Sequence, residues 1–179
     1  MTGTNMVETL IRKHGFDDFR WLDPKDIVVA QWVRMKCIYG CPDYGQNACC
    51  PPNAPPVEDC ERFFREYKSA VIFHFAKTVD KPEDRHAWSR GVNDKLLALE
   101  QEVFLAGHVK AFLMFMDSCG LCSKCVGARA ECKKPKLARP SPDAMGIDVF
   151  STVLKAGYPI EVLSDYKQQM NRYAILLVA

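Results

Sequence analysis

Four cysteines in the second half of the chain constrain its fold more than any other feature. Cys119, Cys122 and Cys125 are each separated by two residues, and Cys132 follows after six more. At this spacing the backbone wraps around a single point and can turn its amide N–H groups toward sulfur, so three thiolates converge on one centre. We therefore expect a metal centre here, with the rest of the chain serving as its scaffold.

The spacing favours an iron–sulfur cluster and leaves zinc as the alternative. Bacterial ferredoxins bind [4Fe-4S] clusters through the pattern C-x2-C-x2-C-x3-C-P. Here the last gap is six residues, and proline comes three positions after Cys132, at Pro135. Structural zinc also takes four thiolates, but usually from two separated C-x2–4-C pairs. The compact run of three cysteines is closer to the ferredoxin pattern.

A second group of five cysteines lies in residues 37–60. Cys37, Cys41 and Cys50 can face one centre, because the glycines between them permit turns. We prefer Cys60 as the fourth ligand, since it falls in the first turn of an expected helix, where the helix dipole favours thiolate. Cys49 is less suited because neighbouring side chains point apart. Cys60 as a buried apolar residue, and an open site with three thiolates, remain alternatives.

Cysteine usage and charge indicate the compartment. The chain has nine cysteines, an odd number, and its first residues, MTGTNMVETLIRKHG, lack the long apolar stretch of a signal peptide. We therefore expect a cytoplasmic protein whose close cysteine pairs hold metal rather than form disulfides. A formal net charge of +2 and the absence of a long apolar run give no reason to expect nucleic-acid binding or membrane insertion.

The hydrophobic pattern predicts a mixture of helices and strands. Their order after residue 69 indicates an α+β or α/β sandwich in a single domain, residues 1–179. Cysteine loops 37–60 and 118–142 would leave the ends of two of its strands. We expect helices over residues 5–15, 57–68, 85–106 and 148–156, and strands over residues 26–35, 69–76, 109–116, 160–163 and 172–179. His74, within the strand expected over residues 69–76, is expected to be a structural core residue.

The two cysteine groups predict a redox function. We expect two [4Fe-4S] clusters that pass single electrons between protein redox partners, with the chain free or a subunit of a larger complex. An enzyme or maturation factor with an open cluster, and a zinc-stabilised structural or adaptor protein, are the alternatives. An electron-transfer protein fits the pattern better than an independent catalyst. Five basic residues surround the second group: Lys124, Arg129, Lys133, Lys134 and Lys136. They are expected to form a solvated basic surface; the alternatives are that they offset the negative charge of the cysteines or dock an acidic partner protein.

Three segments together resemble a known family. KCIYGCPDYGQNACCPPN at residues 36–53, CGLCSKC at 119–125 and ARPSPDAMGIDV at 138–149 are similar to the uncharacterised "predicted metal-binding protein" family of anaerobic bacteria and archaea, a domain of unknown function of about this length. The resemblance covers nearly the whole chain. It implies a cysteine-bound metal and no particular reaction. The ligands that it implies are Cys37, Cys41, Cys50, Cys119, Cys122, Cys125 and Cys132.

Overall fold

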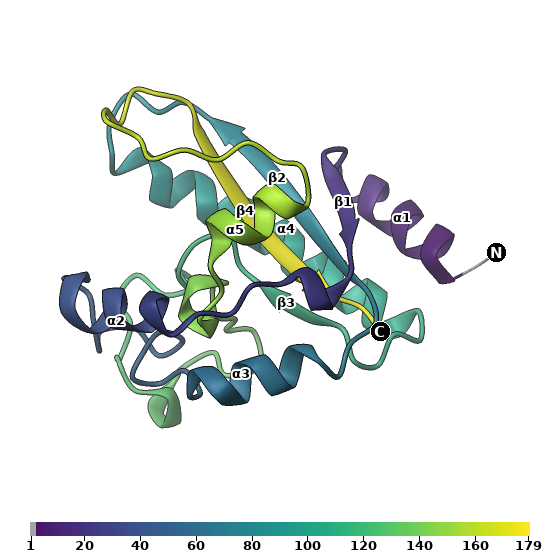
Figure 1. The fold of residues 1–179 in the computed structure, drawn as a ribbon, viewed down its shortest axis with the longest axis horizontal. Helices are drawn as coiled ribbons and strands as arrows, with labels where there is room; N and C mark the ends of the chain where they lie inside the picture. The colour runs from purple at the N-terminus through teal and green to yellow at the C-terminus, as the bar shows by residue number, and fades with distance from the viewer. Residues whose placement is uncertain (1–2) are drawn as a thin grey trace.

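The computed structural model describes residues 3–179, which form an antiparallel sheet covered by helices (Figure 1). Neighbouring strands are all antiparallel, in the order β1-β2-β4-β3. This pairing confirms the α+β prediction and decides against its α/β alternative. The helices are α1 (Gly3–Lys13), α2 (Gln31–Gly40), α3 (Val57–Phe64), α4 (Asp84–Leu105) and α5 (Val149–Lys155), and the strands are β1 (Phe19–Leu22), β2 (Ala70–Lys77), β3 (Phe112–Met114) and β4 (Met170–Leu177).

The centre of the sheet is the pairing of β2 with β4, which extends over eight residues of each strand. Side chains alternate between the faces, so Val71 and Phe73 of β2 enter one apolar cluster and Ala70 and Ile72 enter another. Because both faces are covered, β2 is apolar without interruption over its first four residues. This explains why the run SAVIFHFA predicted a buried strand correctly.

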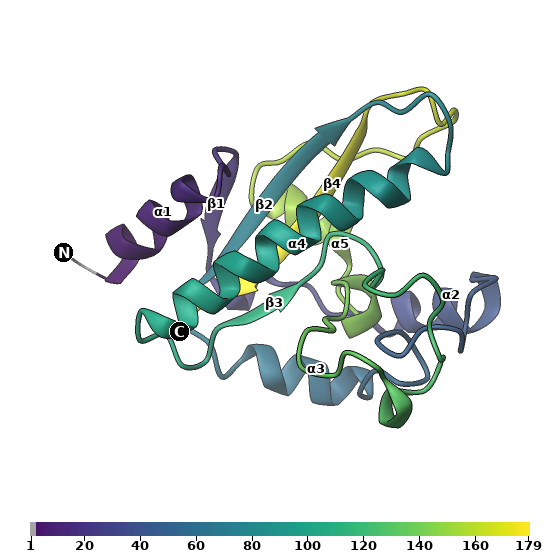
Figure 2. The same ribbon diagram turned by 180° about the vertical axis from the view of Figure 1, so that it is seen from behind.

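Helices α1 and α4 cover one face of the sheet. Val7 and Ile11 of α1 pack with Leu96 and Leu99 of α4 against the first cluster, and Figure 2 shows α4 running the length of the sheet. Helices α3 and α5 contribute to the cluster on the opposite face. None of the helices within residues 3–179 is both long and apolar enough to cross a membrane.

Three local predictions were wrong. Residues 26–35 are not a strand: the β-branched segment is extended but forms only one isolated bridge, Val29 to Ile147, and the chain then enters α2. Residues 160–163 form no strand because no neighbouring segment pairs with them in the described structure. Strand β1 was missed, although its short FRWL sequence pairs with β2 along its whole length. The first cysteine loop therefore follows a helix rather than a strand.

Candidate metal centre

The two cysteine segments lie beside α2 and α3, below the sheet in Figure 1. Helix α2 carries Cys37 in its last turn, and Cys41 is the first residue beyond it. The second segment follows β3, which ends at Met114, two residues earlier than predicted, because only residues 112–114 of the predicted strand pair with β4. Both segments consist mainly of turns and bends, as their glycine and proline content predicts.

Cys37, Cys41 and Cys50 come together as a first thiol group. Burial raises the pKa of the Cys50 thiol to about 12, and the nearby Asp143 carboxylate, Cys37, Cys41 and also Cys119 of the second group act in the same direction. Burial and Asp143 likewise raise the pKa of Cys37, against the influence of Arg34. Cys41 therefore lies close enough to Cys37 and Cys50 to raise the pKa of both thiols.

Cys49 turns away from this group and joins the second one. Its side chain is buried and hydrogen-bonded to that of Cys119, and this bond raises the pKa of Cys49 and lowers the pKa of Cys119. Cys132 lies near enough to raise the pKa of Cys49 as well. Cys119 is near both adjacent cysteines, whereas Cys37 and Cys41 act on Cys50 and Cys132 acts on Cys49. Sequence reasoning considered Cys49 only as a ligand of the first group.

Backbone N–H groups point at sulfur in the second group. The amide of Ala48 donates to Sγ of Cys125 at 3.3 Å. Backbone hydrogen bonds from Leu121 and Arg139 also help to lower the pKa of Cys119, after the bond with Cys49. Such bonds favour the thiolate form, which is the form that binds metal. Cys122 lies half-buried in the same loop, and no hydrogen bond of its thiol is found within residues 3–179.

Two asparagines join the loops to each other. Asn47 donates from Nδ2 to the carbonyl of Cys119 at 2.9 Å. Asn53 donates from Nδ2 to the carbonyl of Gly127 at 2.7 Å and accepts at Oδ1 from the amide of Arg129 at 3.1 Å. These bonds span more than 70 residues of sequence, so the cysteine segments form one interlocked unit rather than two separate loops. The sequence contained no signal for this contact.

Cys60 lies apart from both groups. It lies in the first turn of α3, as predicted, and it is fully buried. Its Sγ faces the carbonyl of Pro55 at 3.7 Å and Sδ of Met145 at 4.0 Å. Burial raises its pKa, with Arg34 acting in the opposite direction. The expectation of a lowered pKa at this thiol is therefore wrong, because desolvation outweighs the influences that lower it.

Asp143 is a site residue that sequence reasoning missed. It opens a short 3-10 turn, Asp143–Met145, that packs against α2 and ends at Gly146 with a positive φ of 79°. Arg34 of α2 binds the same turn through the carbonyl of Ala144, at 3.1 Å. The turn follows the second cysteine loop in sequence, but its Asp143 lies near Cys37 and Cys50 of the first thiol group. The signal was its position within the ARPSPDAMGID motif.

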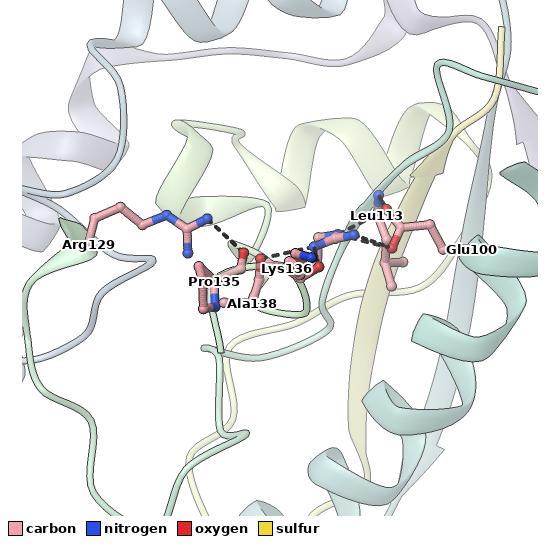
Figure 3. Close-up of polar contacts among 7 residues, drawn as sticks. Glu100, Leu113, Arg129, Pro135, Lys136 and Ala138 are labelled. Atoms are coloured by element: carbon pink, nitrogen blue, oxygen red, sulfur yellow. Dashed lines mark hydrogen bonds and ion pairs between the residues drawn. The ribbon is translucent and has the colours of Figure 1, made fainter. Parts of the chain in front are cut away.

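A buried ion pair fixes the end of the second cysteine loop. Glu100 of α4 is only 3% exposed, accepts from the amide of Leu113 at 2.8 Å and pairs with Arg139 at 2.9 Å (Figure 3). Arg139 also donates to the carbonyls of Lys136 and Ala138, both at 3.1 Å. The loop is thereby tied to the sheet and to α4, which is a rigid support for the thiols.

The basic residues of the second loop are exposed, as expected. Residues 118–142 contain six lysines and arginines and one acidic residue, Glu131. Lys134 donates to the carbonyl of Leu121 at 2.8 Å. Arg129 donates to the carbonyl of Pro135 at 3.1 Å (Figure 3). The loop therefore surrounds the second thiol group with positive charge, which offsets the negative charge of thiolates.

The donor set fits a soft, thiophilic metal. Sulfur is the donor in both groups, and thiolates select zinc, copper(I) or iron–sulfur clusters. Within residues 3–179, no three His, Cys, Asp or Glu side chains converge closely enough to hold a single metal ion. A tetrahedral zinc site with Zn–S bonds of about 2.3 Å needs its sulfurs about 3.8 Å apart. In a cluster the thiolates bind different irons, so they lie farther apart.

The fold and the site together define a cysteine-rich α+β protein with two thiol groups on interlocked loops. The chain belongs to the predicted metal-binding protein family DUF2284, which matches residues 20–178. The family resemblance seen in the sequence is thus confirmed, and the family description names a metal without its identity. No curated protein and no solved structure shows significant similarity to this chain.

Proposed function

We propose that this protein binds two [4Fe-4S] clusters and transfers single electrons between redox partner proteins in the cytoplasm. The observation that carries the proposal is the division of the cysteines into two sulfur-only groups on one interlocked unit. The first group is Cys37, Cys41 and Cys50. The second is the ferredoxin-like run with Cys132, joined by Cys49.

Each part of the surroundings has a role in this function. When bound, a [4Fe-4S] cluster takes up and releases one electron at a time. The N–H···S bond from Ala48 and the positive charge of Arg129 and Lys134 stabilise the more negative, reduced state and so raise the potential. The contact between the loops keeps the two thiol groups near each other, as passage of an electron from one to the other requires.

Absorption spectroscopy of anaerobically purified protein tests the proposal. We expect a brown protein whose broad visible absorption is bleached by dithionite and returns on reoxidation. Cys125→Ser should remove part of this absorption, because Cys125 is a proposed ligand of the second cluster and its sulfur accepts the amide N–H of Ala48 within that group. A colourless protein with stoichiometric zinc would contradict the proposal and support a structural or adaptor role.

The placement of Cys60 favours a second candidate, an enzyme or maturation factor with an open iron at the first group. Cys60 faces Met145 and Pro55 and no other cysteine, which leaves three thiols in that group. Iron content of Cys60→Ser separates the possibilities. If iron content is unchanged, the open site gains support, whereas loss of half the iron makes Cys60 the fourth ligand of a closed electron-transfer site.

A further inference from the structure

A cavity of about 410 Å³ lies between α3 and the second cysteine loop. This is within the range of about 300–1,000 Å³ that small-molecule sites occupy. Seven of the nine cysteines do not line it, and the two that do, Cys49 and Cys60, are not part of the same thiol group. The cavity is therefore separate from the space that either thiol group would enclose around a metal.

The walls of the cavity are mostly apolar. Phe63 of α3 and Phe112 of β3 meet edge to face, with ring centroids 5.1 Å apart and an interplanar angle of 78°. Met145 lines the adjacent wall and is itself buried. These side chains come from three elements that the core holds in place, so the apolar surface is preformed. It fits the flat or branched hydrocarbon body of a small molecule.

Charges at the polar end of the cavity are not balanced. Arg139 lines it, but its guanidinium is neutralised by the buried carboxylate of Glu100. The carboxylate of Asp59 pairs with Arg62. Arg129 also lines the cavity, and among the described residues no carboxylate lies within 4.0 Å of it. One positive charge therefore remains, on a side chain able to bind a carboxylate through two parallel hydrogen bonds.

We infer that this cavity binds a small apolar carboxylate, with its acid group on Arg129 and its hydrocarbon body against Phe63, Phe112 and Met145. The ligand would lie beside Cys49, at the edge of the second thiol group. Arg129 binds the carboxylate of the ligand and the aromatic wall packs against its hydrocarbon body. A neutral molecule of the same shape therefore loses the contact with Arg129 and keeps the apolar contacts. This inference holds for either metal.

Calorimetric titration of the protein with its metal as isolated tests the inference. The probes are 2-naphthoate and its neutral counterpart 2-naphthamide, which differ in charge and hardly in shape. For a ligand of this size we expect naphthoate to bind with a dissociation constant on the order of 1 mM, and the amide at least about 10-fold more weakly. Failure of naphthoate to bind at several millimolar, or equal affinity for the two probes, would overturn the inference.

Three variants locate the binding. Arg129→Gln should weaken naphthoate binding about 10-fold and leave amide binding unchanged, because it removes the charge contact and, besides that, a single exposed bond to the Pro135 carbonyl. Lys133→Gln removes the same charge from an exposed residue outside the cavity and should change neither. Ala54→Phe fills the cavity from the first cysteine loop and should abolish binding of both probes. Equal effects of the first two variants, or retained binding in the third, would refute the assignment.

Discussion

Asn53 holds the two cysteine loops together, and its removal should make the metal centre open far more easily. Its side chain makes three hydrogen bonds: to the carbonyls of Gly127 and Asn47 at 2.7 and 3.2 Å, and from the amide of Arg129 at 3.1 Å. The bond to Asn47 lies within the first loop, and the other two join the loops at about 1 kcal/mol each, so Asn53→Ala should cost about 2 kcal/mol of the contact between the loops. That corresponds to about a 30-fold rise in the open population.

The assay is the rate at which an excess of chelator removes metal, measured under anaerobic conditions. If opening of the loops limits release, Asn53→Ala should lose metal about 30-fold faster than the unmodified protein. Gln46→Ala is the matched control, because Gln46 makes one exposed bond within the first loop, to Pro42 at 3.0 Å, and should speed release no more than about threefold. Equal rates for the two variants would show that the loops do not hold each other closed.

Two further predictions concern stability. Glu100→Gln leaves Arg139 without its buried partner and should cost about 3 kcal/mol, which lowers the melting temperature by at least about 6 °C. The control Glu61→Gln, at an exposed ion pair, should lower the melting temperature by no more than about 3 °C, and similar falls in the two variants would refute the role of the buried pair. Burial works to raise the pKa of Asp18, but hydrogen bonds from His74 and Tyr158 outweigh it and lower the pKa. The ionised carboxylate therefore stabilises the fold above its unfolded pKa of about 3.9, and this stabilisation is lost as the pH falls through the lower pKa of the folded state. Urea unfolding should therefore show Asp18→Asn to be less stable than the unmodified protein at pH 7 but not near pH 3, and an equal difference at both would contradict this.

Much of the fold could be predicted because its signals are local. The apolar stripe along residues 85–106 predicted α4 to within one residue at each end, and the mostly apolar segment 69–76 predicted β2 equally closely. The prediction for residues 26–35 failed because it merged an extended segment around Val29 with the start of α2. Short strand β1 was missed because four residues hold too little periodicity to stand out.

The candidate site was predictable in composition and less so in its grouping. Cysteine spacing indicated two sulfur-rich groups, and the adjacent cysteines do differ in part of their surroundings: Cys37 and Cys41 act on Cys50, Cys132 acts on Cys49, and Cys119 acts on both. The partner of Cys49 depends on contacts between segments more than 70 residues apart, such as that of Asn47 with Cys119. Such contacts are set by tertiary packing and leave no periodic pattern. The same holds for Asp143, whose place beside the first group follows from the packing of a turn against α2.

The central claim is that the two thiol groups hold iron–sulfur clusters. Iron and acid-labile sulfide, counted on protein purified and kept without oxygen, test it most directly. Two [4Fe-4S] clusters predict about eight irons and about eight sulfides per chain. Zinc in a fixed ratio to the chain, without labile sulfide, would contradict the account.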